Sequence, residues 1–345
     1  MAAFSNARPS SLPPPPLTLQ THRFETSCFS TFAQDTETLL TASFETDYGM
    51  TKIEKTIAKK GKNEDEVFDE QETKAVLRKY YGDMKQIFKN YAAGIGSGNE
   101  IFAMGKNAYY NLLETCFIMD EEGVKGGLGR AEAGLIFVVA QNVGPKGSFN
   151  KKNTLTRFQF MDAIVDMAIR KYRDTKVCSS TKEAVEKLLS VNILGKSDMK
   201  GLVEYKEGIM YTEEVDKVVK KNMPSLAAIF KVYSGKFNLP NEKDKTMSFV
   251  EWGELFFDCD LLADGFADRN MRIIFVRSQQ TVVDEMKDKS SRSMNVVEFV
   301  HGVCWTAACE GGGETGLGKG LGVLVQKLVN RFNQHLKLAN RKKKG

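Results

Sequence analysis

Histidines are few in this sequence, and paired cysteine motifs are absent. Its 345 residues include three histidines, which lie far apart at His22, His301 and His335. A zinc site, or a nucleophile with a histidine base, would therefore have to be assembled from residues distant in the sequence. The six cysteines show no CxxC spacing, which indicates reduced thiols in an intracellular protein and not a disulfide framework. These features argue against an enzyme and against a zinc site.

Long apolar runs are also missing. No stretch approaches the roughly 18 consecutive apolar residues that a membrane-spanning helix needs. Hydrophobic residues make up 42% of the chain, which is enough for one large or two medium cores, and the net charge of +5 is modest. We expect partners other than membranes and nucleic acids.

Four amphipathic runs share one pattern, in which an apolar first residue is followed five positions later by an aromatic residue. The runs are Met104–Phe117, Leu155–Ala168, Met247–Phe257 and Met294–Ala307, and their aromatic residues are Tyr109, Phe160, Trp252 and Phe299. The first two runs begin 51 residues apart and the last two 47, whereas 92 residues separate the second from the third. These intervals predict two pairs of helix–loop–helix units, because an array of single units would be evenly spaced.

Further helices are expected around these runs. Apolar residues recur at three- and four-residue steps over residues 70–92 and again after Pro224, which we place at a helix start. The runs 133–140 and 270–276 are uniformly apolar and could be strands by pattern alone, but their place in the repeat favours helices. Ser180 and Thr212 are expected caps of two connecting helices.

This pattern resembles the EF-hand superfamily, to which calmodulin belongs. The resemblance implies that the apolar residue of each loop joins a two-residue β contact with a paired loop, and that an acidic residue four places later closes a calcium site. It implies an all-α fold with two pairs of EF-hand-like units, a helical connector between them and an extended N-terminal tail. The expected segments are a tail over 1–68, a first pair over 69–175, a connector over 176–221, a second pair over 222–310, and a Gly-rich turn, helix and basic tail over 311–345.

The loops have lost most of the ligands that calcium requires. The pattern D-x-[DN]-x-[DN]-G-x5-E is absent, and the closing position holds Ala108 in the first unit and Gln159 in the second. In the fourth loop, Lys287 stands at the first ligand position and Arg292 at the glycine position, where positive charge opposes a divalent cation.

The third loop comes nearest to a calcium site, although Lys245 stands at its glycine position. We expect no bound metal and no cofactor, with calcium binding by this loop as the alternative. The remaining candidate ligands are Glu242, Asp244, Glu251 and Glu298.

The two ends of the chain differ from its middle. The first residues are rich in proline and serine, and Pro13 to Pro16 predict an extended polyproline stretch. No acid precedes Glu25, so a mitochondrial presequence is the alternative interpretation. Near the other end, residues 313–320 match GxxxxGK, but Gly320 replaces the magnesium-binding Ser or Thr of a phosphate loop, so we expect a turn before a last helix.

Calcium-incompetent hands with long loops, an aromatic-bearing tail and basic termini are similar to the EF-hand proteins of ciliary and flagellar axonemes, including those inside doublet microtubules. The resemblance implies a non-enzymatic structural protein of the axoneme, with tubulin and other axonemal proteins as partners. The alternatives are a calcium-sensing adaptor of the cytoplasm with one active hand, or an accessory subunit of an organellar complex, for example in the mitochondrion.

Overall fold

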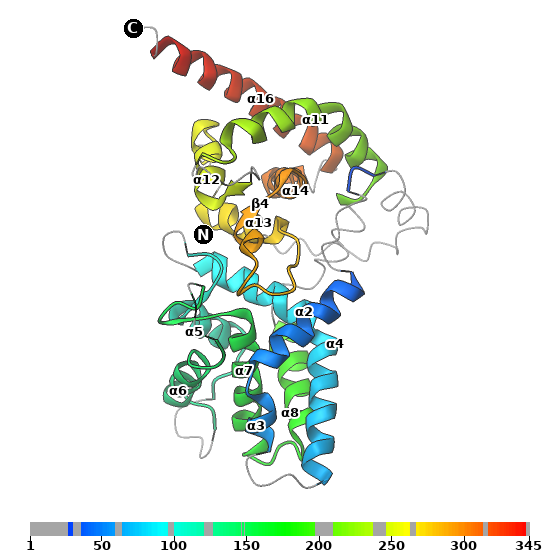
Figure 1. Cartoon of the computed structure of the whole chain (residues 1–345), viewed down its shortest axis with the longest axis vertical. Coiled ribbons are helices and arrows are strands. Elements are labelled where there is room, and N and C mark those ends of the chain that lie inside the picture. Colours follow the sequence, from blue (N-terminus) through cyan, green and yellow to red (C-terminus); the bar gives the residue numbers. More distant parts are fainter. Residues whose placement is uncertain are drawn as a thin grey trace. The chain divides into compact units, whose positions relative to one another are not determined.

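Helices account for nearly all the regular structure of the computed structural model (Figure 1). In the described residues, the strands are four segments of two residues each. The expected all-α class is therefore confirmed. None of the helices in the described part of the chain combines the length and apolar character needed to cross a membrane. The structure describes residues 27–29, 36–58, 64–95, 100–120, 127–145, 147, 149–196, 210–236, 246–262, 267–312 and 317–342.

The chain divides into two units by its internal contacts, and each is described by itself. The larger unit comprises residues 33–200 and 230–302, and the smaller unit comprises residues 1–32, 201–229 and 303–345. The expected boundary between residues 221 and 222 lies inside helix α11 (Glu213–Tyr233).

Two antiparallel strand pairs join the loops of the larger unit. β1 (Met104–Gly105) pairs with β2 (Thr154–Leu155), and β3 (Met247–Ser248) pairs with β4 (Ser293–Met294). In the first pair Met104 lies opposite Leu155, and in the second Met247 lies opposite Met294. All four side chains are fully buried. The apolar residues that open the four sequence runs are thus the residues that face one another across the strands.

The helices that follow β1 and β3 match each other residue by residue. α5 (Lys106–Thr115) and α12 (Phe249–Asp258) both begin two residues after the first strand residue and have the same length. Each ends on a buried cysteine and then a residue with φ of 51°, Phe117 in one and Asp260 in the other. The next residue donates its N–H back to the helix over 2.9 Å, from Ile118 to Leu113 and from Leu261 to Phe256. Such left-handed caps satisfy the last carbonyls of a helix.

The helices that follow β2 and β4 match in the same way. α7 (Arg157–Ala168) and α14 (Val296–Ala307) have 12 residues each and continue into five-residue π-helical turns, η2 (Ile169–Arg173) and η6 (Ala308–Gly312). Before the strands lie α6 (Arg130–Ala140) and α13 (Asp268–Ser278), so the helical interpretation of these two apolar runs is confirmed.

A repeated hydrogen bond links the helices within each of these halves. The hydroxyl of Tyr109 donates to the Ala133 carbonyl of α6 over 3.1 Å. The indole N–H of Trp252 donates to the Met271 carbonyl of α13 over 3.3 Å. Both aromatic residues stand five positions after a strand residue, so the two halves repeat one structural plan.

Part of the expected N-terminal tail is helical, which corrects the prediction of an extended segment over 1–68. α2 (Glu37–Met50) and α3 (Ile53–Ile57) precede the long helix α4 (Glu64–Ile95). The apolar side chains of α2 and α3 are buried in the core of the larger unit, and this burial offsets the entropy of ordering the segment. They are Phe44, Tyr48, Ile53 and Ile57. Residues 1–26, including the proline run, lie outside the described residues.

The connecting helices begin at their expected caps. Ser180 accepts the N–H of Glu183 at the start of α8 (Thr181–Lys187), and Thr212 accepts the N–H of Val215 at the start of α11. α8 runs on through η3 (Leu188–Ile193) and α9 (Leu194–Lys196). The helix start at Pro224 is wrong, since Pro224 lies within α11. Buried residues on both sides of the proline keep one face of the helix packed; they are Val215, Val219, Leu226 and Ile229.

The smaller unit contains the last helix, α16 (Leu317–Lys342), and confirms a helix after the glycine-rich segment. Leu317 to Gly320 of the GxxxxGK match form its first turn, and the segment before the match is the helix α14 with its turn η6, not a strand. In the same unit, the N–H of Cys28 donates to the Asp216 carboxylate over 2.7 Å, and the ring of Phe29 meets that of Tyr211 edge-on at 5.6 Å.

Asp162 of α7 is a buried carboxylate with one oxygen bonded and one without a hydrogen-bond partner. Its Oδ1 accepts the N–H of Lys52, the residue that caps α3, over 3.1 Å, whereas its Oδ2 has no partner. Burial raises the pKa of Asp162 to about 6, against the opposing effect of the Lys52 N–H. The charged form therefore destabilises the fold at neutral pH.

This shift predicts a pH-dependent effect of Asp162→Asn. Because the pKa is raised on folding, the contribution of Asp162 to stability is complete below about pH 4 and is lost as the pH rises through about 6. Asparagine does not ionise, so we expect the variant to gain about 2 kcal/mol relative to the wild type between pH 4.5 and 7.5. Urea unfolding at both pH values measures this gain. The exposed Asp174→Asn is the control, and a difference that stays constant with pH would contradict the assignment.

Candidate functional site

The calcium-closing positions of the four units occupy one structural position. Each of them is the third residue of a helix that begins directly after a strand or one residue later. The four residues are Ala108, Gln159, Glu251 and Glu298. Glu242 and Asp244, the other two candidate ligands, lie outside the described residues. A side chain at this position is available to a metal only if its oxygens are not already bound by other groups of the protein.

Glu251 is 1% exposed, and both of its oxygens accept backbone N–H groups. Oε1 accepts from Lys236 over 2.5 Å, and Oε2 accepts from Ser248 over 2.6 Å. The Ser248 hydroxyl in turn accepts the N–H of Glu251 over 3.3 Å, which completes a capping box. Since Lys236 follows the end of α11, this one carboxylate ties the end of the first helix to the start of the second.

Glu298 makes the same two contacts in the fourth unit. Oε1 accepts the N–H of Gln280, just after α13, over 2.6 Å, and Oε2 accepts the N–H of Asn295 over 2.7 Å. Asn295 reciprocates by accepting the N–H of Glu298 over 3.0 Å. Burial raises the pKa of Glu298, and the two backbone N–H groups oppose this shift by stabilising the carboxylate.

Gln159 reproduces the arrangement without a charge. Its Oε1 accepts the N–H of Thr156 over 2.9 Å, and its Nε2 donates to the carbonyls of Gln141 and Val143, each over 3.0 Å. Those carbonyls follow the end of α6. We call the side chains of Gln159, Glu251 and Glu298 the loop staples, because each joins the two ends of its helix–loop–helix unit. Ala108 has no polar side-chain atom and makes no such bond.

The described residues do not fit a calcium site. Calcium takes six to eight oxygen ligands, with the closing carboxylate bidentate. Ligation by Glu251 or Glu298 would leave two backbone N–H groups without acceptors, at a cost of about 1 to 3 kcal/mol for each group. Within the described ranges, no three histidine, cysteine, aspartate or glutamate side chains gather closely enough to hold a metal ion.

The two cations of the fourth loop, Lys287 and Arg292, contact an acid and two aromatic rings of the protein. Lys287 is exposed and lies 3.1 Å from the Asp284 carboxylate. Arg292 lies against two rings, Phe102 and Phe149, with its guanidinium carbon 4.6 Å from each ring centroid. Arg292 is therefore a packing residue of the larger unit, in addition to being a cation near the loop.

A sequence signal for the loop staples exists, and it coincides with the closing positions of calcium loops. The capping-box pattern places Glu or Gln three residues after Ser, Thr or Asn at a helix start. It occurs at Thr156 to Gln159, at Ser248 to Glu251 and at Asn295 to Glu298. The same glutamates could serve a metal or the backbone, and the structure assigns their oxygens to the backbone.

Removing the Glu251 side chain should lower the free energy of unfolding more than removing the partly exposed side chain of Glu254. We expect Glu251→Ala to lower the free energy of unfolding by about 2 to 4 kcal/mol, because two buried N–H groups lose their acceptors. Glu254→Ala is the matched control: its carboxylate pairs with the Lys236 side chain at a partly exposed site, and the expected loss is below about 1 kcal/mol. Equal losses in chemical denaturation would show that Glu251 is no staple.

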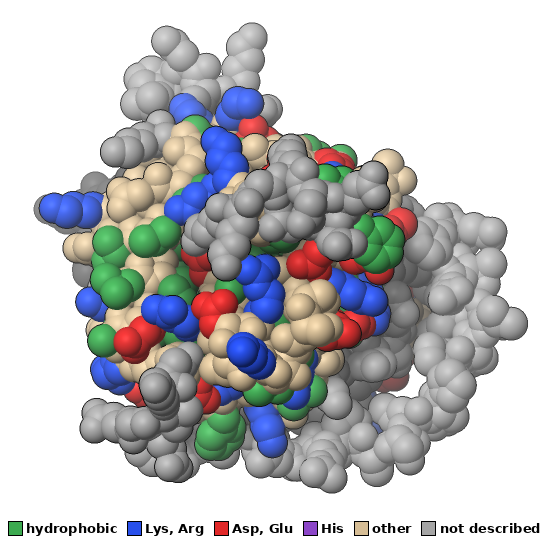
Figure 2. Space-filling view, turned by 90° about the horizontal axis from the view of Figure 1, so that it is seen from below, with side chains coloured by type: hydrophobic (Ala, Val, Ile, Leu, Met, Phe, Trp, Pro, Cys, Tyr) green, Lys and Arg blue, Asp and Glu red, His purple; other side chains and the backbone are tan. Residues whose placement is uncertain are grey.

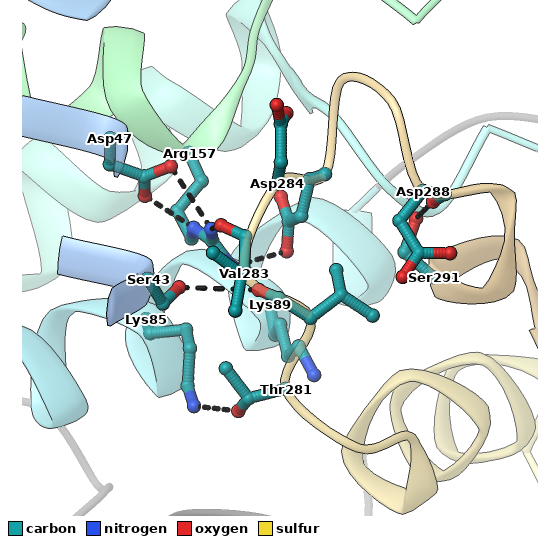
Figure 3. A network of polar contacts seen from close by, with 12 residues as sticks. Ser43, Asp47, Lys85, Lys89, Arg157, Thr281, Val283, Asp284, Asp288 and Ser291 are labelled. Carbon is teal, nitrogen blue, oxygen red and sulfur yellow. Dashed lines mark hydrogen bonds and ion pairs between the residues drawn. The ribbon is translucent and has the colours of Figure 1, made fainter. Parts of the chain in front are cut away.

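A buried polar network fastens the loop between α13 and β4 to helices α2, α4 and α7 (Figure 3). Arg157 is 4% exposed and binds the Asp47 carboxylate through two nitrogens, one of them over 3.0 Å. It also donates to Glu285 over 2.8 Å and to the Val283 carbonyl over 3.3 Å. The Tyr81 hydroxyl donates to Asp47 over 2.8 Å.

Charge keeps this arginine ionised in the interior. Burial by itself lowers the pKa of Arg157, but the charges of Asp47 and Glu285 outweigh it and hold the pKa above its usual value. A buried ion pair whose groups are all hydrogen-bonded stabilises little by itself, yet loss of one partner is costly. The network therefore fixes where the 279–292 loop lies.

Further bonds anchor the same loop. The Lys85 ammonium donates to the Thr281 hydroxyl, and the Ser43 hydroxyl donates to the Val282 carbonyl over 3.2 Å (Figure 3). A cavity of about 610 Å³ beside the loop is lined by several of its residues, among them Asp284 and Asp288. These carboxylates accept N–H groups of the loop itself, from Met286 over 3.0 Å and from Ser290 over 2.8 Å. The acids of this loop thus stabilise its own turns.

No family model, no curated protein and no solved structure matches this chain. The class of the protein therefore has to be argued from its own geometry, namely the strand pairs, the repeated helix bounds and the loop staples.

Proposed function

We propose that the two strand pairs and the helices on either side of them form two degenerate EF-hand pairs. Three features support this assignment: short antiparallel contacts between loops, an apolar residue at the centre of each contact, and a helix that starts two residues later. The equal lengths of α5 and α12, and of α7 and α14, support a duplication of one pair.

The function that this geometry supports best is that of a calcium-independent, non-enzymatic scaffold. The observation that carries it is the use of both Glu251 oxygens and both Glu298 oxygens by backbone N–H groups. The loops of the second, third and fourth units are closed by the side chains of Gln159, Glu251 and Glu298 where a sensor closes its loops around an ion, so these three need no ion to hold their helices in place. A calcium-free scaffold is suited to a permanent assembly.

Helix α6 offers an apolar surface through which the protein could contact other members of an assembly. Its outward face carries Leu135, Val138 and Val139, which are 64%, 46% and 44% exposed. Figure 2 views the chain from below and shows hydrophobic side chains gathered toward the left, the side on which α6 lies in Figure 1. Apolar residues at this spacing on an exposed helix face favour contact with another protein.

The assembly we propose is the ciliary or flagellar axoneme, where the protein would bind the doublet microtubules and contact tubulin and neighbouring axonemal proteins. The degenerate hands, the modest positive charge and the resemblance to axonemal EF-hand proteins support this proposal. Tubulin is acidic, so a basic protein is complementary to it.

Co-sedimentation tests the proposal. Purified full-length protein is mixed with salt-washed axonemal doublets, or with microtubules, at physiological ionic strength, in parallel with EGTA and with millimolar calcium. We expect the protein to pellet with doublets to a saturable extent, equally in both buffers. Protein that stays in the supernatant in both buffers would refute the axonemal assignment, and pelleting that requires calcium would favour the calcium-sensing adaptor.

A further inference from the structure

Helix α16 contains basic residues and no acidic ones. Between Leu317 and Lys342 it has six lysines and arginines and one histidine, but neither aspartate nor glutamate. The basic residues are Lys319, Lys327, Arg331, Lys337, Arg341 and Lys342. Such a helix concentrates positive potential along its length.

The apolar side of α16 is buried. Five side chains at helical spacing are 0% to 6% exposed, and they are Leu321, Leu324, Val325, Leu328 and Phe332. The opposite side is exposed, with Lys319, Gln326, Asn330 and Lys337 on it. Lys319 and Lys337 are 18 residues apart, which is five helical turns, so they project from the same face about 27 Å from each other.

This face is an open surface formed by α16 alone, with Lys319, Gln326, Asn330 and Gln334 among its residues. The carboxamide of Gln326 donates to that of Asn330 over 3.0 Å. Both carboxamides lie between Lys319 and Lys337 along the helix. We call this surface the α16 face.

Two acids lie against the first half of α16. Glu310 is 3.2 Å from Lys327, and a side chain at Gly318 would meet Glu214 at 2.5 Å. Lys337, ten residues after Lys327 and exposed, extends the positive charge of the helix beyond these two contacts.

We propose that the α16 face binds an acidic polypeptide segment, in which glutamates or aspartates alternate with small residues. In an extended peptide, side chains on one side recur about every 6.7 Å, and four such steps span about 27 Å, which is the separation of Lys319 and Lys337 along the helix. The carboxamides of Gln326, Asn330 and Gln334 both donate and accept, which matches the N–H and C=O groups of a peptide backbone.

Two other anionic partners fit this face less well. A membrane-bound amphipathic helix inserts its apolar side, but the apolar side of α16 is buried, and Val323 is the one large apolar side chain that is exposed in the described part of this helix. Single-stranded nucleic acid is held by stacking on aromatic rings, but Phe332 is the sole aromatic residue of α16 and is 6% exposed. This inference is independent of the proposed axonemal function, because it uses only the charge and packing of α16.

Fluorescence anisotropy with the full-length protein tests the inference. The probe is a fluorescein-labelled Glu–Gly repeat peptide, with a Gln–Gly peptide as the neutral probe. We expect saturable binding of the Glu–Gly peptide that weakens with salt. The double variant Lys319→Gln, Lys337→Gln should weaken it about fivefold to tenfold, since each exposed ion pair contributes at most about 1 kcal/mol.

The matched control is Lys217→Gln, Lys221→Gln, which removes the same charge from exposed positions on α11 in the same unit. Circular dichroism verifies that both variants fold. We expect the control to retain wild-type affinity. The proposal is overturned if neither peptide binds, if both peptides bind equally, if the control loses as much affinity as the α16 variant, or if phosphatidylserine vesicles or a single-stranded oligonucleotide bind more tightly than the Glu–Gly peptide.

Discussion

Arg157→Met is expected to lower the free energy of unfolding by about 3 to 5 kcal/mol, because it leaves the Asp47 carboxylate buried without its cation. The loss also removes the bonds to Glu285 and to the Val283 carbonyl, so the loop between α13 and β4 loses an anchor. Chemical denaturation measures the change, and hydrogen exchange over residues 279–292 should show faster opening.

Two variants make this result specific. Arg170→Met removes an exposed arginine that lies close to Asp174 in the same part of the chain, and it should cost less than about 0.5 kcal/mol. The double variant Arg157→Met, Asp47→Leu removes both buried charges and should recover much of the loss. If Arg157→Met is no worse than Arg170→Met, the buried network does not fasten the loop.

Gly144→Ala should also destabilise strongly, by about 2 to 4 kcal/mol. Gly144 has φ of +76°, and a Cβ placed there would lie 2.4 Å from the Phe158 ring and 3.1 Å from the Met50 carbonyl. The turn at Gly144 follows Val143, whose carbonyl is bound by the Gln159 staple. The substitution therefore disturbs both packing and loop closure.

Gly49→Ala is the matched control in α2, where an added Cβ meets nothing within 4 Å. Alanine has the higher helix propensity, so we expect this variant to gain up to about 1 kcal/mol. Thermal and urea unfolding of the two variants should move in opposite directions. A neutral Gly144→Ala would show that the turn can relax, contrary to the geometry around Phe158.

The spacing of apolar residues marked four positions, and the resemblance to EF-hand proteins predicted that these residues meet in short strand contacts. Met104, Leu155, Met247 and Met294 stand out because each begins an amphipathic helix, and the structure places them opposite one another in two pairs. Periodicity is a local property, so it also located the helices that follow them. It could not show that Asp47 and Arg157 meet, because 110 residues separate them and each is an ordinary charged residue in the sequence.

The N-terminal helices and the loop staples were harder to predict from the sequence, because local patterns do not show which groups a side chain meets in the fold. Phe44 and Tyr48 are buried in the core of the larger unit, but polar residues separate them in the sequence, so α2 shows little apolar periodicity. Glu251 satisfies both a calcium-closing position and a capping box, so the sequence pattern fits two roles. Only the positions of the Lys236 and Ser248 N–H groups distinguish them.

The central claim is that side chains close these loops in place of an ion, and thermal unfolding with and without calcium tests it most directly. A site of micromolar affinity would stabilise the protein by about 4 kcal/mol at millimolar calcium, enough to raise the Tm by several degrees. We predict the same Tm in EGTA and in millimolar calcium, for the wild type and for Glu251→Gln alike. A rise of several degrees in calcium that Glu251→Gln abolishes would contradict the account.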